Sequence, residues 1–149
     1  SIAFAFNCLV VVCSDWVKTM GGKMLENAEM YTSLPCKDVE RATKFYKDKL
    51  GLTPKEERMG NAFYENAGSK FFLYESPSAG SNQATAACWN VDDIKAVNKQ
   101  LRNNGVEFEH YDDIPGINRE GDIHSNGEGF QCCWFKDSED NIISITQMT

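Results

Sequence analysis

The sequence predicts an α+β domain in which one structural unit is used twice. Two stretches, Asp38–Gly51 and Asp92–Gly105, each run from an aspartate to a glycine thirteen positions later, and they lie 54 residues apart. Each has apolar residues at helical spacing, follows a short apolar run and precedes runs of period two. This recurrence predicts a repeated order of strand, helix and two or three strands. A ferredoxin-like β-α-β-β-α-β domain is the alternative, although it leaves the last hairpin of the chain unexplained.

The first unit is expected to begin with a weakly alternating strand over 30–36. Asp38 is a suitable N-cap, because its carboxylate can accept the unpaired N–H groups of a first helical turn. Gly51 is expected to end this helix in the left-handed conformation. The aromatic runs 61–65 and 70–75, separated by a turn at 66–69, predict a hairpin.

The second unit repeats this order. Asp92 is the expected N-cap of its helix, and Gly105 is expected to follow the last helical turn. The expected strands are 84–91, 106–111, 130–135 and 141–147. The polar, acidic segment 112–129 is expected to be a loop.

Length and composition limit the classes of function. With 149 residues and a formal net charge of −7, the chain suits one domain and lacks the basic face that nucleic acid requires. Six cysteines are present, but no C-x-x-C pair indicates zinc, and the adjacent Cys132 and Cys133 point to opposite faces of a strand. We therefore expect buried free thiols and a reducing, cytoplasmic setting.

Residues 1–29 are expected to be an N-terminal appendage or an extra element, and residues 30–149 the domain, with modules at about 30–76 and 83–149. The apolar run Ile2–Cys13 is shorter than the roughly 20 residues that span a membrane. No basic residue precedes it and no small-x-small cleavage site clearly follows. An appendage, an element packed on the domain or a partner, and a secretion signal or anchor remain open.

A resemblance to a known family begins at Leu34–Tyr46 and continues through Leu50-Gly51-Leu52. These residues resemble the opening of the vicinal oxygen chelate superfamily, which contains glyoxalase I, extradiol dioxygenases, fosfomycin resistance enzymes and bleomycin-binding resistance proteins. Trp134–Ile145 resembles its closing F-x-D-P-D-G-N hairpin, with Ser138 and Asp140 in place of Pro and Gly. The resemblance implies two βαβββ modules whose sheets curl into a cup, with the helices outside and the ligand inside. It also implies a homodimer.

The same resemblance implies where a metal ion would be held. Metal-dependent members place one His, Gln or Glu on each of four strands facing the cup, and such ligands suit hard divalent ions. The corresponding positions are Tyr31, a position near Leu73, Ala86 (or Thr85) and Ser144. None of these is a usual ligand, so we expect no metal and no cofactor.

Period two along the strands predicts which side chains line the cup. Leu34 and Cys36 are assigned to the helix side, and so are Phe72 and Tyr74. The expected lining residues are Tyr31, Ser33, Phe71, Leu73, Ala86, Cys88, Asn90, Ile142, Ser144 and Thr146. Such a mixed surface suits an organic ligand of moderate polarity. Alternatively, these side chains simply fill the space.

Of the two histidines, His124 is the candidate catalytic residue. It is expected in the acidic segment just before a strand, where a loop can close over the cup, and histidine suits proton transfer near neutral pH. His110 is expected at a strand end, on the surface. If the acidic segment lines the mouth of the cup, its charge favours a cationic ligand. The carboxylates concerned are Asp112, Asp113, Glu120, Asp122 and Glu128.

Three functions follow from these observations. The first is metal-independent binding of a small organic molecule, cationic if the acidic segment lines the mouth. The second is a metal-dependent lyase, isomerase or dioxygenase with displaced ligands, drawn from Glu65, Glu75, Cys88, His110 and His124. The third is an interaction or structural protein with a filled cup. The sequence does not decide whether a reaction is catalysed. The expected partners are a small molecule and a second copy of the chain, with neither nucleic acid nor membrane.

Overall fold

The structure, a computed structural model, describes residues 24–149. The chain divides into two units, residues 1–30 and 31–149. In the first unit, residues 24–30 include a turn in which the Ala28 N–H donates to the Leu25 carbonyl at 3.0 Å. The interpretations of the run Ile2–Cys13 lie outside the described residues. All the elements below belong to the second unit.

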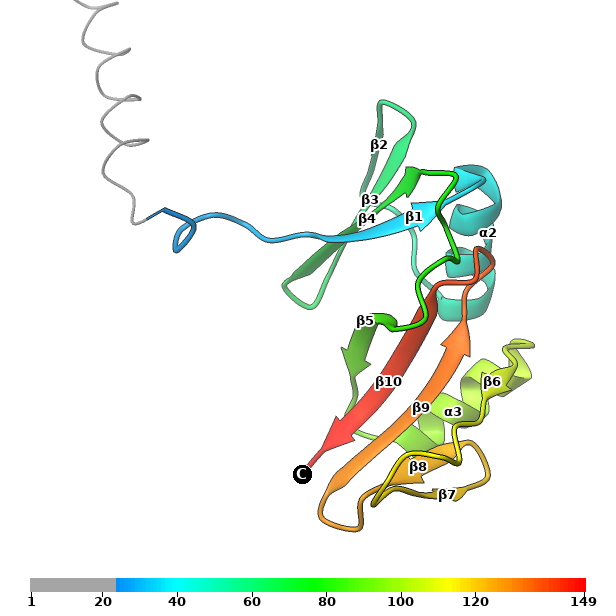
Figure 1. The fold of residues 1–149 in the computed structure, drawn as a ribbon. Helices are drawn as coiled ribbons and strands as arrows, with labels where there is room; N and C mark the ends of the chain where they lie inside the picture. Colours follow the sequence, from blue (N-terminus) through cyan, green and yellow to red (C-terminus); the bar gives the residue numbers. More distant parts are fainter. Residues whose placement is uncertain (1–23) are drawn as a thin grey trace, which may run out of the picture. The chain divides into compact units, whose positions relative to one another are not determined.

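The first module has the predicted order β-α-β-β-β (Figure 1). Its elements are β1 (Thr32–Cys36), α2 (Val39–Leu50), β2 (Glu56–Arg58), β3 (Asn61–Asn66) and β4 (Ser69–Glu75). The strands form a mixed sheet in the order β1-β4-β3-β2, in which only β1 and β4 are parallel. This parallel pairing sets Leu34 opposite Leu73, and both side chains are fully buried. The two residues therefore mark the helix side of the sheet.

The second module repeats this plan with an insertion. Its elements are β5 (Thr85–Asn90), α3 (Ile94–Asn103), β6 (Phe108–Glu109), β7 (Asn118–Glu120), β8 (Ile123–Ser125), β9 (Phe130–Lys136) and β10 (Ile142–Met148). The sheet order is β5-β10-β9-β8-β7, and β6 also pairs with β9. The expectation of a loop over 112–129 is wrong in part, because β7 and β8 form a hairpin within it. Strands of three residues are too short to show a period in the sequence.

Both helices begin at an aspartate and end beside a glycine, as the repeat predicts. Asp38 is the N-cap of α2, and Gly51 ends it with a φ of 70°. In α3, however, the N-cap is Asp93, whose carboxylate accepts the N–H of Ala96 at 3.0 Å. The assignment of Asp92 is therefore wrong by one residue, because an N-cap side chain must reach the N–H two or three residues ahead.

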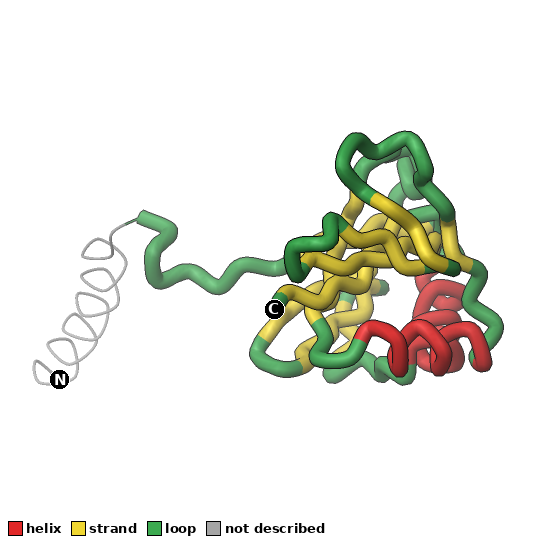
Figure 2. Tube along the Cα trace, turned by 90° about the horizontal axis from the view of Figure 1, so that it is seen from below, coloured by secondary structure: helices red, strands yellow, loops and turns green. Residues whose placement is uncertain are grey.

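One hydrophobic core lies between the helices and both sheets. Figure 2 shows both helices on one side of the strands. The Phe71 ring of β4 lies 5.8 Å from that of Tyr46 in α2 and 5.6 Å from that of Trp89 in β5, so aromatic contacts join the modules. The helix ends also meet, where the Lys49 ammonium donates to the Asn104 carbonyl at 2.7 Å. Each sheet packs its helix-bearing face against this core. The opposite face of each sheet carries no helix.

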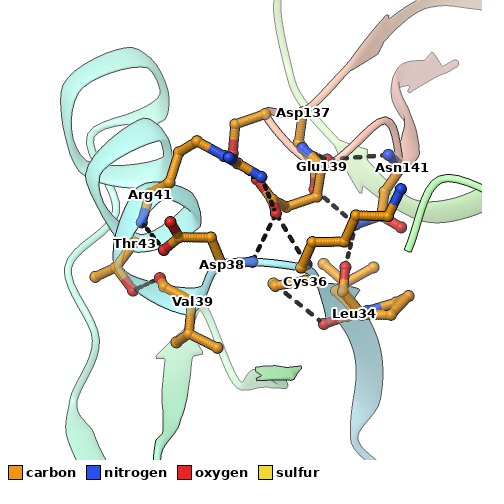
Figure 3. Close-up of polar contacts among 12 residues, drawn as sticks. Leu34, Cys36, Asp38, Val39, Arg41, Thr43, Asp137, Glu139 and Asn141 are labelled. Atoms are coloured by element: carbon orange, nitrogen blue, oxygen red, sulfur yellow. Dashed lines mark hydrogen bonds and ion pairs between the residues drawn. The ribbon is translucent and has the colours of Figure 1, made fainter. Parts of the chain in front are cut away.

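A polar junction, formed by Arg41, Asp137, Glu139 and Asn141, joins the β9–β10 turn of the second module to the start of α2 in the first (Figure 3). The buried Glu139 carboxylate accepts the backbone N–H groups of Lys37 and Asp38 at 2.9 and 3.0 Å. It also accepts two hydrogen bonds from the Arg41 guanidinium, at 2.9 and 2.8 Å. One side chain thus holds the start of the helix against the other module.

Asp137 is a buried hydrogen-bond acceptor of the same polar junction. Its carboxylate accepts the Tyr46 hydroxyl at 2.8 Å and the Asn141 amide at 3.0 Å, and that amide also donates to the Pro35 carbonyl at 2.9 Å. Burial raises the pKa of Asp137, although the hydrogen bonds from Asn141 and Tyr46 favour the carboxylate. The residues that carry the family resemblance in this hairpin therefore have a structural use: they set how the modules pack.

The predicted fold class is confirmed. The described residues form an α+β unit with two helices and two mixed sheets, and the first module is a βαβββ module. The two sheets do not close on one another, so each keeps a helix-free face. Within residues 24–149, neither helix has the length and apolar character needed to cross a membrane.

Candidate binding site

The helix-free face of the first sheet carries four aromatic side chains, Tyr31, Phe63, Phe72 and Tyr74, which we call the aromatic face. Phe63 and Phe72 occupy paired positions on β3 and β4, and their rings stack with centroids 5.4 Å apart. Tyr31 meets both rings edge-on, at 6.4 and 6.2 Å, and is 39% exposed. Such stacked and edge-to-face pairs hold the rings in a defined arrangement. The result is a platform of rings that no helix covers.

Three basic side chains border the aromatic face. The Arg58 guanidinium lies 5.4 Å from the Phe63 ring centroid, and the Lys70 ammonium lies 5.7 Å from that of Tyr31. Lys55 forms an ion pair with a glutamate of β3. Together with Tyr31, Phe63 and Phe72 and the carboxylates Glu56 and Glu65, these residues line an open hollow of about 390 Å³. Arg58 Nε lies 3.7 Å from the Glu56 carboxylate. The hollow therefore combines aromatic surface with paired basic and acidic groups.

The helix-free face of the second sheet is built from small, hydroxyl-bearing and sulfur-bearing side chains. Cys88 Sγ lies 3.2 Å from Thr146 Oγ1, and Ser144 pairs with Cys88 on one side and Trp134 on the other. Ser144 and Thr146 are only 3% and 5% exposed. Burial raises the pKa of Cys132, opposite Thr146, to about 12. Its thiol is therefore neutral near pH 7.

A second hollow, of about 420 Å³, lies beside this face and is lined in part by Thr85, Tyr111, Trp134 and Ile142. The Trp134 indole N–H donates to Thr85 Oγ1 at 3.1 Å. The indole ring also meets the Tyr111 ring edge-on, with centroids 5.3 Å apart. These contacts hold the indole in place beside the hollow.

His124 does not lie in a loop over the face, so its predicted placement is wrong. It belongs to β8, is fully buried, and meets the Trp134 ring edge-on at 4.8 Å. Its Nε2 accepts the Tyr111 N–H at 3.0 Å, which leaves the proton on Nδ1. Burial lowers its pKa, which favours the neutral ring. Its catalytic role stays a prediction that this geometry does not favour.

Two carboxylates of the acidic segment are bound by arginine side chains. The buried Asp122 carboxylate accepts hydrogen bonds from Arg102 Nε and from Arg102 Nη2, the latter at 2.6 Å, and lies 2.9 Å from His110 Nε2. The hydrogen bonds from Arg102 hold the pKa of Asp122 well below its usual range, although burial opposes this. Asp112 is bound by Arg119. Attraction of a cation by this segment therefore depends mainly on Asp113, Glu120 and Glu128.

The structure corrects the predicted lining on β4. Phe71 and Leu73 belong to the core, with exposures of 5% and 0%, and Phe71 packs on Tyr46 of α2. Phe72 and Tyr74 take the helix-free side instead. All four β4 residues are large and apolar, so alternation alone does not distinguish the two faces.

The other predicted lining residues follow the expected alternation, with one irregularity. Because Leu34, Cys36, Trp89, Ile143 and Ile145 belong to or pack on the core, their strand neighbours point to the helix-free side. These neighbours are Ser33, Cys88, Asn90, Ser144 and Thr146. Ala86 lies where the pairing of β5 with β10 shifts register, and it also packs against the core.

The side chains at the four family positions do not fit a metal ion. With Leu73 turned into the core, its helix-free neighbours on β4 are Phe72 and Tyr74. With Phe72 the set becomes Tyr31, Phe72, Ala86 and Ser144, and Tyr74 in place of Phe72 adds only a phenol group. The set contains no carboxylate, imidazole or amide group. In the part of the chain that the structure describes, no three His, Cys, Asp or Glu side chains converge on a possible metal position.

The five side chains considered as displaced metal ligands of a metal-dependent enzyme lie apart from one another in the structure. Glu65 is paired with Lys55, and His110 lies against Asp122. His124 is buried behind Trp134. The remaining candidates are Glu75, exposed at the end of β4, and Cys88, on the second sheet. The structure does not bring the five together.

Several side chains of the hollow over the aromatic face were missed by sequence reasoning, namely Arg58, Phe63, Lys70 and Phe72. The sequence could have placed the two phenylalanines together. The predicted turn at 66–69 pairs Asn66 with Ser69, and this register sets Phe63 opposite Phe72. No such signal existed for Arg58, which lies in a short strand of exposed residues.

Comparisons with known proteins agree with this architecture. The family model of the Glyoxalase/Bleomycin resistance protein/Dioxygenase superfamily matches residues 30–114. The match spans more than half of the chain, and the chain belongs to this superfamily. The resemblance stated from the sequence is thereby confirmed. A search of curated proteins found no match.

Solved structures share the fold at low sequence identity. The fosfomycin resistance protein FosX from Listeria monocytogenes has a TM-score of 0.62 and 15% identity, covering 83% of this chain and 94% of that chain. A lactoylglutathione lyase from Agrobacterium tumefaciens has a TM-score of 0.59 and 17% identity, covering 81% and 93%. A glyoxalase/bleomycin resistance protein/dioxygenase from Nocardioides has a TM-score of 0.59 and 16% identity, covering 92% and 93%. At these identities the likeness concerns the fold alone.

Proposed function

We propose that this protein binds a small organic molecule on its helix-free sheet faces and does so without a metal ion. The observation that carries the proposal is the side-chain set Tyr31, Phe72, Ala86 and Ser144 at the four family ligand positions. Divalent ions in such proteins need carboxylate, imidazole or amide donors, and this set has none. The two hollows, of about 390 and 420 Å³, lie within the size range of small-molecule sites.

The proposed contacts come from both sheets. On the first sheet they are Tyr31 and Ser33, joined by Phe63 and Phe72 in place of Phe71 and Leu73. On the second sheet they are Ala86, Cys88, Asn90, Ser144 and Thr146, joined by Trp134. The supporting observation is that most of these residues are strand neighbours of core residues and so point away from the core, whereas Ala86 also packs against it.

A homodimer is part of the proposal. The core joins both modules on the helix side, so the two helix-free faces of one chain are not packed against each other. Small-molecule sites bury most of the ligand surface, which one open face does not achieve. A second copy of the chain supplies the missing cover. Sedimentation of the full chain at increasing concentration tests this step.

The two hollows differ in the charged side chains that line them. Asp112 and Asp113 line the second hollow, and Asp112 is also bound by Arg119. The cationic preference predicted from the sequence is therefore assigned to the second hollow. Basic side chains border the first hollow.

A ligand screen on metal-free protein tests the function. The full chain is treated with a chelator, its metal content is measured by elemental analysis, and small aromatic and aliphatic molecules are screened by amide-resolved NMR. The expected result is ligand-induced shifts on the helix-free faces with far less than one metal ion per chain. Binding that disappears with the metal and returns with it overturns the proposal in favour of the metal-dependent enzyme. Absence of binding with and without metal overturns it in favour of an interaction protein.

The proposal includes a reducing, cytoplasmic setting. The four cysteines within the described residues, Cys36, Cys88, Cys132 and Cys133, are free thiols. Burial raises the pKa of Cys36 and Cys133 to about 12, which keeps these thiols neutral. Nucleic acid is not a proposed partner, because the net charge is −7.

A further inference from the structure

We propose that a third hollow, on the helix side of the sheets, binds a small neutral apolar molecule that carries a hydroxyl group. This inter-module hollow has a volume of about 150 Å³. The first module contributes Leu50, Leu52 and Asn66 to it, and the second module contributes six apolar or aromatic residues. The inference goes beyond the proposed function, because that function concerns the helix-free faces.

The apolar lining of the inter-module hollow suits an apolar ligand. Leu101, Phe135 and Ile145 are 7%, 0% and 5% exposed and belong to the core. Trp89 and Val97 pack against this core but keep part of their surface exposed. An apolar cavity of about 150 Å³ takes a benzene-sized molecule. The hollow therefore has the size and the surface for one small ring.

The absence of charge around the inter-module hollow favours a neutral ligand. Among the described residues that line it there is no lysine, arginine, histidine, aspartate or glutamate. The first and second hollows, in contrast, are both lined in part by charged side chains. An ion that moves from water to an apolar surface without a partner of opposite charge loses much of its solvation free energy. Charged molecules are therefore expected to avoid this hollow.

The Asn66 amide supplies a polar group on this apolar surface. The side chain lies on the helix side of β3, in alternation with the buried Ala62 and Tyr64, and it lines the hollow. Its Oδ1 is buried and accepts no hydrogen bond from any other residue of the range 24–149. A buried acceptor without a donor is unfavourable.

A ligand hydroxyl group can satisfy the Asn66 amide. The terminal torsion of asparagine is soft, so the amide can turn toward a group in the hollow. The amide offers an acceptor and a donor side by side, and a hydroxyl group both donates and accepts. Besides the Trp89 indole, Asn66 is the one lining side chain that can form a hydrogen bond. One hydroxyl group on an otherwise apolar ligand therefore matches the lining.

Contacts within the protein hold the walls of the hollow in place. Next to Leu50, the Lys49 ammonium donates to the Asn104 carbonyl at 2.7 Å, and the Asn104 amide donates to the Lys49 carbonyl at 2.9 Å. The Trp89 ring meets the Phe71 ring at 88°, with centroids 5.6 Å apart. A site that is formed before the ligand arrives avoids the entropic cost of ordering its walls.

Four probes separate size, hydroxyl group and charge. Phenol has a ring and a hydroxyl group, cyclohexanol has the hydroxyl group on a saturated ring, benzene has no hydroxyl group, and benzoate is charged. Each is titrated into the full chain at neutral pH and followed by amide-resolved NMR. We expect phenol and cyclohexanol to bind about threefold to tenfold more tightly than benzene, which corresponds to one net hydrogen bond. Benzoate should cause no saturating shifts in the inter-module hollow.

The expected shifts lie at Asn66, Trp89 and Val97, which come from both modules. A ligand that contacts both modules binds the folded chain and not the unfolded one. Phenol should therefore raise the melting temperature progressively with its concentration, and benzoate should not.

Variants link the binding to the named side chains. Asn66→Leu keeps the size of the side chain but removes the amide, so phenol should bind no more tightly than benzene. Asn118→Leu is the matched control, because it makes the same exchange on the exposed strand β7, and it should change neither affinity. Val97→Phe fills the hollow and should weaken the binding of phenol and benzene alike, by at least about tenfold. Urea unfolding of each variant checks that the fold is retained.

Each of the following results would overturn the inference. Equal affinity of the native chain for phenol and benzene removes the role of the Asn66 amide. Phenol binding that Val97→Phe leaves unchanged places the site elsewhere. Shifts confined to the helix-free faces do the same, although they support the proposed function, so the two failures remain distinguishable. Absence of binding by all three neutral probes shows that the hollow takes no ligand of this class.

Discussion

Replacement of Glu139 by alanine tests whether the polar junction holds the two modules together. The buried Glu139 carboxylate accepts two backbone N–H groups, those of Lys37 and Asp38, in addition to the Arg41 guanidinium. Burial opposes ionisation, but the hydrogen bonds from Arg41 and the Asp38 N–H outweigh it and lower the pKa of Glu139. The native carboxylate is therefore charged near neutral pH.

The loss in the free energy of unfolding on Glu139→Ala follows from the N–H donors that are left without a partner. An unsatisfied donor costs about 1–3 kcal/mol, and water can reach part of this site once the side chain is gone. Taking the lower half of that range for each of two N–H groups gives a loss of about 2–4 kcal/mol in the free energy of unfolding. Glu139→Gln can retain Oε1, which accepts both backbone N–H groups, and should cost clearly less than half as much, because it loses only the charge and the Oε2 contacts with Arg41 and Ser138. Arg41→Ala should cost least, because its side chain is 53% exposed and water replaces the lost contact.

Urea unfolding followed by circular dichroism measures this order. Glu40→Ala is the matched control, because Glu40 is also an acidic residue at the start of α2 but is exposed. Its loss should change the free energy of unfolding by less than about 1 kcal/mol. The reasoning is refuted if Glu139→Ala behaves like Glu40→Ala, or if Arg41→Ala destabilises as much as Glu139→Ala. The second result would mean that the ion pair, rather than the backbone contacts, carries the stability.

Three further predictions concern the packing of the modules and the buried histidine. Tyr46→Phe removes the hydroxyl that binds Asp137 at 2.8 Å and should cost about 1.5–3 kcal/mol in urea unfolding; a loss near zero would show that this hydrogen bond contributes no net stability. Gly80→Ala should destabilise clearly more than Gly127→Ala: both glycines have positive φ, but an added Cβ meets Asp140 Cβ at 2.8 Å only at Gly80, and equal melting temperatures would contradict this. The lowered pKa of His124 means that the unfolded chain takes up a proton first, so its contribution is complete above pH 6.5 and declines as the pH falls from 6.5 toward the folded-state pKa. The decline should be smaller in His124→Gln, and parallel pH profiles of unfolding free energy would contradict the assignment.

Local features of the fold were predictable from the sequence because they depend on neighbouring residues. An N-cap and a helix-ending glycine act within a few positions, so the aspartate-to-glycine repeat located both helices, with an error of one residue at Asp93. The polar junction was not predictable, because Glu139 reaches the Asp38 N–H across 101 residues and only the packing of the modules brings them together.

The candidate site was predictable only in part, for a related reason. Alternation gave the observed faces of β1 and β10, and of β5 except at Ala86, but β4 reads Phe71-Phe72-Leu73-Tyr74 and gives no polar marker. The pairing of Leu34 with Leu73 shows that Leu73 lies on the helix side of the sheet. This pairing depends on how the two strands align in the sheet, so it cannot be read from the sequence of β4 alone. His124 was misplaced because the short strand β8 interrupts a segment whose composition is typical of a loop.

The affinity of a ligand found in the NMR screen for the chelator-treated chain, measured by calorimetry with chelator present and again with Mn(II) added, tests metal-independent binding most directly. Mn(II) is the appropriate ion, since one structure of FosX, which shares the fold, is a complex with Mn(II) and sulfate. We expect binding in chelator with an affinity that Mn(II) leaves unchanged within about twofold, because Tyr31, Phe72, Ala86 and Ser144 provide no metal site. Binding that appears only when Mn(II) is present at one ion per chain would show that the protein depends on a metal ion instead.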